Sequence, residues 1–152
     1  MKHIITFGTT AAALLAMAAC SAQDPAQPPA QSPAPAVQQE LTTKLLVSDG
    51  GTKALTVESA PSGPRVEATV AGQVSRDGAG CVILLGNDGT DWTLIFPAGT
   101  SLDGEAAVLP DGSALTRGDQ VRLDGTRIPA NEGASMCLNY ARLLSVERAV
   151  AG

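Results

Sequence analysis

Six Asp-Gly dipeptides divide the chain between residues 49 and 125, and their spacing constrains the fold more than any other feature. Asp-Gly is favoured in tight turns, because glycine adopts a positive φ at little cost. Each dipeptide is therefore expected at a hairpin or loop, and the segments between them are too short for long helices. They predict short strands joined by turns. The dipeptides begin at Asp49, Asp77, Asp88, Asp103, Asp111 and Asp124.

Five segments have the alternation and length that predict β-strands. In the first of them, valines alternate with polar side chains, as expected for a half-buried strand. The second, 81–85, is apolar at every position, which predicts a central strand with both faces buried. The five predicted strands are 66–74, 81–85, 91–96, 121–124 and 141–150.

Two further hairpins are expected outside these five strands. Pro110-Asp111-Gly112 predicts the turn of a small hairpin between the third and fourth strands. Residues 40–64 are ambiguous, because Leu41 and Leu45 have helical spacing, whereas Asp49-Gly50-Gly51 lies between two apolar runs. We favour a hairpin there.

Five strands with a long break after the third resemble the OB-fold, a small Greek-key barrel. The stretch 115–125, in which Gly118-Asp119 leads into an alternating strand, is similar to the fourth-strand entry of OB-like domains. The resemblance implies an all-β fold, with a small OB-like five-stranded Greek-key barrel over residues 65–152 and an extra N-terminal hairpin. Strands two and three form the usual binding surface of such domains. Trp92 and Phe96 on the third strand are therefore either core residues or a platform on which a ligand stacks.

The N-terminal residues predict export from the cytoplasm. Lys2 and His3 precede an apolar run that ends at Ala19. This run is too short for a transmembrane helix and is typical of a signal peptide, so residues 1–19 are expected to be removed.

The end of this run, Leu15-Ala16-Met17-Ala18-Ala19-Cys20-Ser21, resembles the lipobox of bacterial lipoproteins. That family usually has leucine where Met17 stands. The resemblance implies that a lipid on Cys20 anchors the mature chain to a membrane. Because Ser21 and not aspartate follows, it also implies the periplasmic face of the outer membrane. Ordinary cleavage, which would give a soluble periplasmic or secreted protein, is the alternative.

Residues 20–39 predict a disordered tether between the lipidated cysteine and the domain. Five prolines alternate there with alanine and glutamine, and few side chains are large and apolar. The packing of such side chains cannot offset the conformational entropy that the segment would lose on becoming ordered. It is interpreted as a spacer, with a ligand for a proline-binding groove as the alternative.

The two remaining cysteines, Cys81 and Cys137, form an even pair in an exported domain. A disulfide between them is expected, because the periplasm is oxidising. A redox pair or a metal-thiolate site is the alternative, although the Cys-x-x-Cys spacing is absent.

The mature chain is expected to contain no histidine, because His3 is the only one and leaves with the leader. Catalysis by Ser-His-Asp or Cys-His groups is then excluded, as are histidine-ligated metals and haem. No catalytic residue, metal or cofactor is therefore expected. Catalysis by paired carboxylates remains as an alternative. The nearby acids are Asp88, Asp91, Asp103 and Glu105.

The net charge of the chain is -5, and loss of Lys2 leaves 9 basic against 15 acidic side chains. Such a chain repels polyanions, so nucleic acid is not an expected partner. The function expected is that of a membrane-anchored, periplasm-facing lipoprotein. It would serve as a non-enzymatic binding or structural module for an envelope protein, peptide or glycan. The alternatives are an inhibitor of an incoming enzyme such as lysozyme, and a carboxylate-dependent enzyme.

Overall fold

The computed structural model describes residues 40–60, 62 and 65–151, and this part of the chain is all-β. The predicted signal peptide and the predicted tether lie outside the described residues. No helix within the described ranges is long and apolar enough to cross a membrane. The elements are β1 (Thr42–Val47), β2 (Lys53–Ser59), β3 (Val66–Arg76), β4 (Val82–Gly86), β5 (Asp91–Phe96), β6 (Ser101–Asp103), β7 (Ala106–Val108), β8 (Ala114–Leu115), β9 (Gln120–Ile128), the 3-10 helix η1 (Glu132–Ala134) and β10 (Leu143–Ala151).

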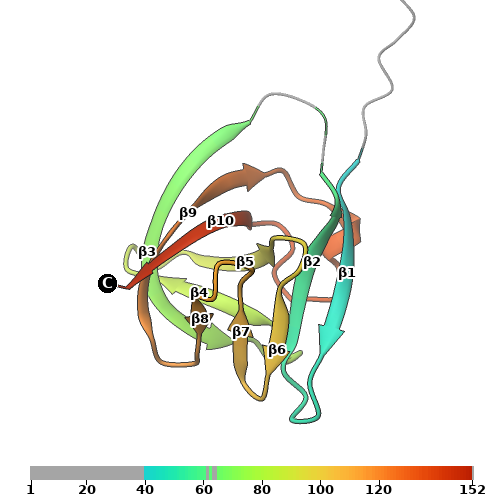
Figure 1. The fold of residues 1–152 in the computed structure, drawn as a ribbon. Coiled ribbons are helices and arrows are strands. Elements are labelled where there is room, and N and C mark those ends of the chain that lie inside the picture. The colour runs from blue at the N-terminus through green and yellow to red at the C-terminus, as the bar shows by residue number, and fades with distance from the viewer. Residues whose placement is uncertain (1–39, 61, 63–64, 152) are drawn as a thin grey trace, which may run out of the picture. The chain divides into compact units, whose positions relative to one another are not determined.

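Five strands close into a barrel in the order β3-β4-β5-β10-β9, with β9 returning to β3 (Figure 1). Successive strands of the barrel are antiparallel, except that β10 runs parallel to β5. A three-strand meander followed by a crossing connection is the Greek-key arrangement that the OB-like prediction requires. The predicted all-β barrel is confirmed, and each of its five strands overlaps its predicted segment, although β9 extends to Ile128, beyond the predicted 121–124.

The N-terminal hairpin is also confirmed, and it joins the sheet of the barrel. β1 and β2 pair as antiparallel strands around a turn in which Gly51 has a φ of 76°. β2 then pairs with the end of β5 in parallel, through Leu55 with Ile95 and Thr56 with Phe96. This pairing extends the sheet to seven strands and leaves β1 at its edge.

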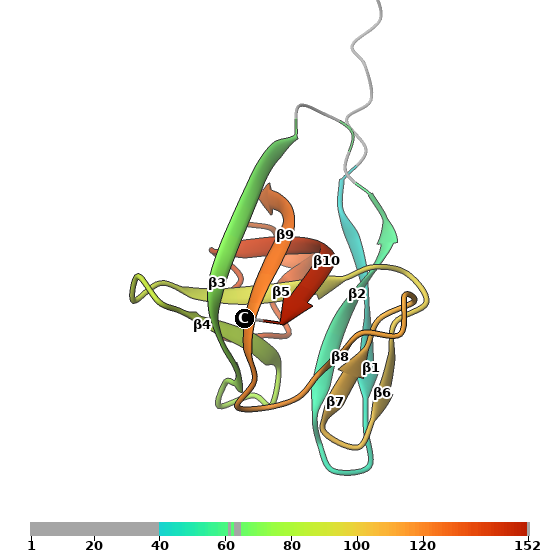
Figure 2. The ribbon, with the colours of Figure 1, turned by 60° about the vertical axis from the view of Figure 1, so that its left-hand side comes forward.

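A small three-stranded sheet, β6-β7-β8, occupies the long break between β5 and β9. The predicted hairpin around Asp111 is therefore confirmed as β7 and β8, and β6 adds a third strand. Its residues Ala107, Leu109 and Leu115 are buried in the same cluster as the barrel interior. The small sheet thus packs against the barrel, as the turned view shows (Figure 2).

The molecule has two apolar cores because β5 is covered on both faces. Trp92, Leu94 and Phe96 point into the barrel with the inward residues of the other strands. Ile95, on the opposite face of β5, packs with Leu143 in a second core outside the barrel. This explains why the segments predicted to be buried are apolar at successive positions.

One Asp-Gly dipeptide is not a turn, which corrects the sequence prediction. Asp124-Gly125 lies within β9, where the strand passes close to β10. A Cβ atom at Gly125 would collide with the carbonyl group of Ser145, and β10 carries an irregularity between Val146 and Arg148 at this point. The glycine is required by close approach of two backbones and not by turn geometry.

Candidate functional site

The predicted ligand platform on β5 lies inside the barrel. Phe96 is fully buried and Trp92 is 7% exposed, and both belong to the main core. The guanidinium of Arg127 lies 5.1 Å from the centroid of the Trp92 ring. Of the two roles left open by the sequence, the structure places these side chains in core packing, so neither is free to stack on a ligand.

Leu85, on the outer face of β4, is 37% exposed. The outer face of β5, the other half of the surface that the OB resemblance makes the usual binding surface, is covered by the chain itself. The loop 129–142, between β9 and β10, lies over it. The backbone N–H of Thr93 donates to the carbonyl of Arg142 at 2.9 Å, and the Thr93 hydroxyl donates to the carbonyl of Asn139 at 2.8 Å. The Asn139 amide donates to the carbonyl of Asp91 at 3.3 Å. A ligand could reach this face only if the loop moved.

The disulfide predicted between Cys81 and Cys137 is present and fixes this loop to the start of β4. Both cysteines are buried, at 1% and 2% exposure. Asp77 connects the same two segments by hydrogen bonds. One oxygen of its carboxylate accepts hydrogen bonds from the N–H groups of Ala79 and Cys81, and the other accepts one from the N–H group of Leu138. The two thiols are joined and buried, so they offer neither a nucleophile nor a thiolate for a metal.

The four acids considered for carboxylate catalysis lie at two turns, Asp88 and Asp91 between β4 and β5, and Asp103 and Glu105 between β6 and β7. Asp88 accepts the N–H of Thr90 in the turn before β5. Glu105 pairs with Arg76 at 2.6 Å in the turn between β6 and β7. Within the described ranges, no group of three or more His, Cys, Asp or Glu side chains is arranged to hold a metal ion.

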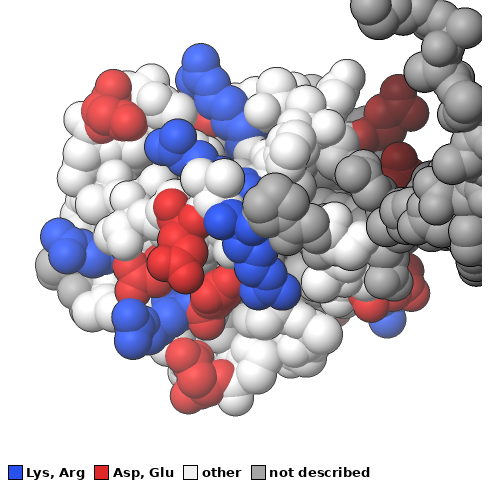
Figure 3. Space-filling view, turned by 90° about the horizontal axis from the view of Figure 1, so that it is seen from above, with Lys and Arg blue, Asp and Glu red and all other residues white. Residues whose placement is uncertain are grey.

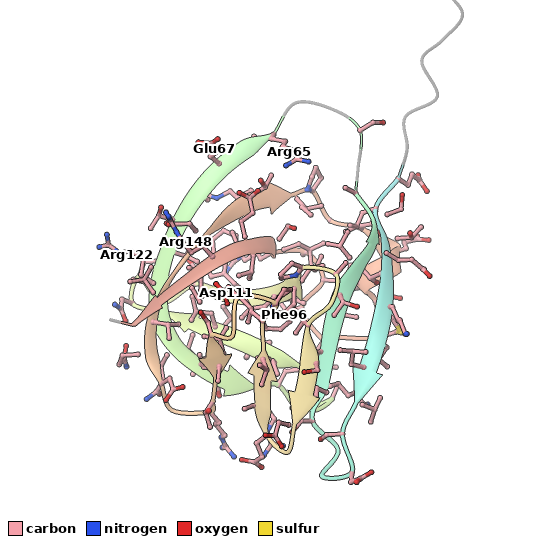
Figure 4. All side chains as sticks on the ribbon, viewed as in Figure 1. Arg65, Glu67, Phe96, Asp111, Arg122 and Arg148 are labelled. Carbon is pink, nitrogen blue, oxygen red and sulfur yellow. A yellow bond between two sulfur atoms is a disulfide. The ribbon has the colours of Figure 1, made fainter. Side chains whose placement is uncertain are left out.

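A gathering of charged groups lies on the outer side of β3, β9 and β10, and we call it the charged face. Figure 3 shows its acidic and basic side chains intermixed, and Figure 4 shows Arg65, Glu67, Arg122 and Arg148 beside these strands. Strand alternation places these side chains outward, because their neighbours on β9 and β10 point into the barrel. The charged face comprises Arg65, Glu67, Thr69, Arg122, Asp124, Thr126, Glu147 and Arg148.

A row of three side chains crosses the centre of the charged face. The register aligns Thr69 of β3, Asp124 of β9 and Arg148 of β10. The Thr69 hydroxyl donates to one oxygen of Asp124 at 2.7 Å, and Arg148 donates to the other oxygen at 2.7 Å and 3.2 Å. The pKa of Asp124 is held below its ordinary value, chiefly because Arg148 and then Thr69 donate to the carboxylate, and the pKa of Arg148 is raised. Asp124 is therefore ionised at neutral pH.

A second row lies beside the first, around the irregularity in β10. The Thr126 hydroxyl donates to Glu147 at 3.0 Å, and Arg65 lies 3.8 Å from the same carboxylate. The two rows border a shallow groove of about 430 Å³ that also includes Glu67. Among the described residues, neither Glu67 nor Arg122 forms an ion pair.

Sequence reasoning missed the charged face. The alternation of Arg122 and Asp124 was used only to predict a strand, although it also places both charges on one face. That Arg148, 24 residues later, would complete the row depends on the register of β10 with β9. An irregular register cannot be read from alternation alone.

Comparison of the chain with models of protein families, with curated proteins and with solved structures finds no match to any of them.

Proposed function

We propose that this chain is a lipid-anchored protein of the bacterial cell envelope, whose barrel acts as a non-enzymatic binding or structural module. The observation that carries the proposal is the pairing of the cysteines. The chain has three cysteines, and Cys81 is joined to Cys137. Cys20 is then left over, in a sequence that resembles a lipobox. An odd cysteine in an exported protein requires a separate explanation, and lipidation supplies one.

The buried disulfide supports the envelope part of the proposal. Disulfides persist in oxidising compartments such as the periplasm and are rare in the cytosol. Several acyl chains on one cysteine, as the lipobox resemblance implies, would hold the protein firmly, because one chain alone gives only marginal binding. The outer membrane, facing the periplasm, remains the proposed location because Ser21 follows Cys20.

The charged face supports the binding part of the proposal. Exposed ion pairs such as Arg148 with Asp124 contribute little to stability, so a partner that offers its own charges exchanges with them at little cost. Glu67 and Arg122 also present charges that form no ion pair with any described residue. We propose that an envelope protein, peptide or glycan with charges of both signs docks here. Histidine-dependent catalysis forms no part of the proposal, because the chain has no histidine beyond His3.

Fractionation of cells tests the anchor. The native chain should be found with the outer membrane, and Cys20→Ser should be found in the soluble fraction. Ser21→Ala, which changes the neighbouring residue and keeps the cysteine, is the matched control and should behave as the native chain. Mass spectrometry should show acyl chains on Cys20. Identical fractionation of the native chain and Cys20→Ser refutes the anchor.

Photo-crosslinking in cells tests the binding face. A photoreactive amino acid at Glu67 should give a discrete crosslinked species, whereas the same amino acid at Glu58, an exposed position on β2, should not. Charge reversal by Arg148→Glu should weaken the Glu67 crosslink severalfold. Crosslinks of equal strength from both positions, or none from Glu67, contradict the assignment of this face.

A further inference from the structure

A second groove, which shares no lining residue with the charged face, lies at one end of the barrel. It has a volume of about 440 Å³ and runs between β8 and the last residues of β10. Ala114 and Leu115 of β8 form one side, Ala149 and Val150 of β10 form the other, and Asp119 lies at the β8–β9 connection.

The strand edges on both sides of this groove are without a partner among the described residues. β10 pairs with β5 only through Leu143–Ser145, so the edge of Val146–Ala151 that faces away from β9 has no ladder. β8 pairs with β7 alone. Figures 1 and 2 both show β8 on the side of β10 opposite to β9. The free edges of β10 and β8 therefore both offer backbone groups for hydrogen bonding beside the groove, whose lining also includes Gln120 and Val121 of β9.

Most of the accessible surface of the groove is apolar, and Ser113, Asp119 and Gln120 supply its polar part. Leu115 and Val121 are nearly fully buried at 2% and 6% exposure, and Ala149 packs against the barrel core. Val150 is 47% exposed, although it is a large apolar residue at a strand end. Unpaired strand edges beside apolar surface are places where an extended peptide adds as a further strand.

We propose that this groove binds an extended peptide segment, which pairs through its main chain with the free edge of β10 and lies against β8. Because the groove has free strand edges on two sides, those of β10 and β8, it favours a peptide over a second copy of this chain. An edge strand of a folded copy, such as β1, already pairs on one side and can offer only its other edge. A free segment offers both edges. The proposal rests on the proposed binding role of the barrel but not on the lipid anchor.

The chemistry of the groove also specifies the peptide. Its side chains alternate between those that enter the groove and those that point away from it. Those that enter meet Leu115, Val121 and Ala149, so they should be small and apolar. We expect segments of alternating small apolar and polar residues, without proline at the positions that donate to β10.

Selection from a phage-displayed library of random ten-residue peptides tests the proposal, with the full-length chain carrying Cys20→Ser as target. Ala114→Trp takes no part in the selection and is the test variant, since the exposed Ala114 position allows the indole to fill the groove without entering the core. Val47→Trp places the same side chain on the exposed edge strand β1 and is the matched control. Selected peptides should bind Ala114→Trp at least tenfold more weakly than the control.

Two measurements identify the mode of binding. In NMR spectra, a selected peptide should shift the amides of β8 and of Val146–Val150 and protect amides on the free edge of β10 from hydrogen exchange. Methylation of alternate backbone nitrogens of the peptide should abolish binding for one of the two alternating sets. Failure to enrich any peptide, equal binding to Ala114→Trp and the control, or shifts confined to other surfaces overturns the proposal. Any of these results leaves the proposed anchor and the Glu67 crosslink unaffected.

Discussion

Removal of the disulfide should cost this barrel a large part of its stability. The bond joins residues 56 positions apart, and the chain-entropy relation gives about 4 kcal/mol for a loop of that length. A small domain of this kind is typically stable by about 5–15 kcal/mol. The double variant Cys81→Ala with Cys137→Ala should therefore lose about 4 kcal/mol of unfolding free energy. Both side chains are buried, so lost packing adds to this loss.

Urea unfolding followed by the fluorescence of Trp92 measures this loss. Trp92 is the only tryptophan and is 7% exposed, so its emission should change when the barrel opens. Met136→Ala is the control, because it changes an exposed residue of the same loop and should alter stability by less than about 0.5 kcal/mol. The native chain treated with a reductant should approach the double variant. A loss below about 1 kcal/mol in the double variant would refute the view that the bond restricts the unfolded chain.

Three further changes test the core, the strand crossing and the charged face. Phe96→Ala should destabilise the protein by about 3–5 kcal/mol in urea unfolding, because a fully buried ring is replaced by a cavity; a loss under about 1 kcal/mol would place the ring at the surface. Gly125→Ala should cost about 1–3 kcal/mol or more, because its Cβ would collide with a carbonyl of β10, and an unchanged unfolding midpoint would contradict that contact. In an NMR titration the pKa of Asp124 should lie below its ordinary value and rise towards it in Arg148→Gln, whereas the lowered pKa of Asp111 should not change. Because the folded pKa of Asp124 is depressed, its contribution to stability is present above the unfolded pKa and is lost as the pH falls through the folded pKa.

Local sequence patterns were sufficient to predict the positions of the strands, because the residues of a strand and the turns beside it are close together in the sequence. The alternation in β3 and β9 and the continuous apolar run of β4 predicted their positions. Asp-Gly turns also gave correct boundaries wherever glycine supplies a positive φ, as at Gly89 and Gly112. The even cysteine pair predicted the bond between Cys81 and Cys137.

The binding surfaces were not predictable in the same way. Trp92 and Phe96 share a face of β5, but only the closure of the barrel decides that this face is the inside. The opposite face carries Thr93, whose burial depends on a loop about 46 residues further along the chain. Alternation distinguishes the two faces of a strand without saying what covers either of them.

The sequence by itself determined the elements: short strands, turns at five of the six Asp-Gly dipeptides, and a cysteine pair able to form a disulfide. Only the tertiary structure decided which faces remain open, because that depends on contacts between residues far apart in the chain. Asp124 and Arg148 meet through the pairing of β9 with β10. The free edge of β10 exists because its pairing with β5 ends at Ser145 and Ile95, one residue before β5 itself ends at Phe96. Hydrogen bonds between two strands join residues that are close in space but far apart in the sequence. The surfaces that remain open to partners depend on these bonds, so they too depend on residues far apart in the sequence.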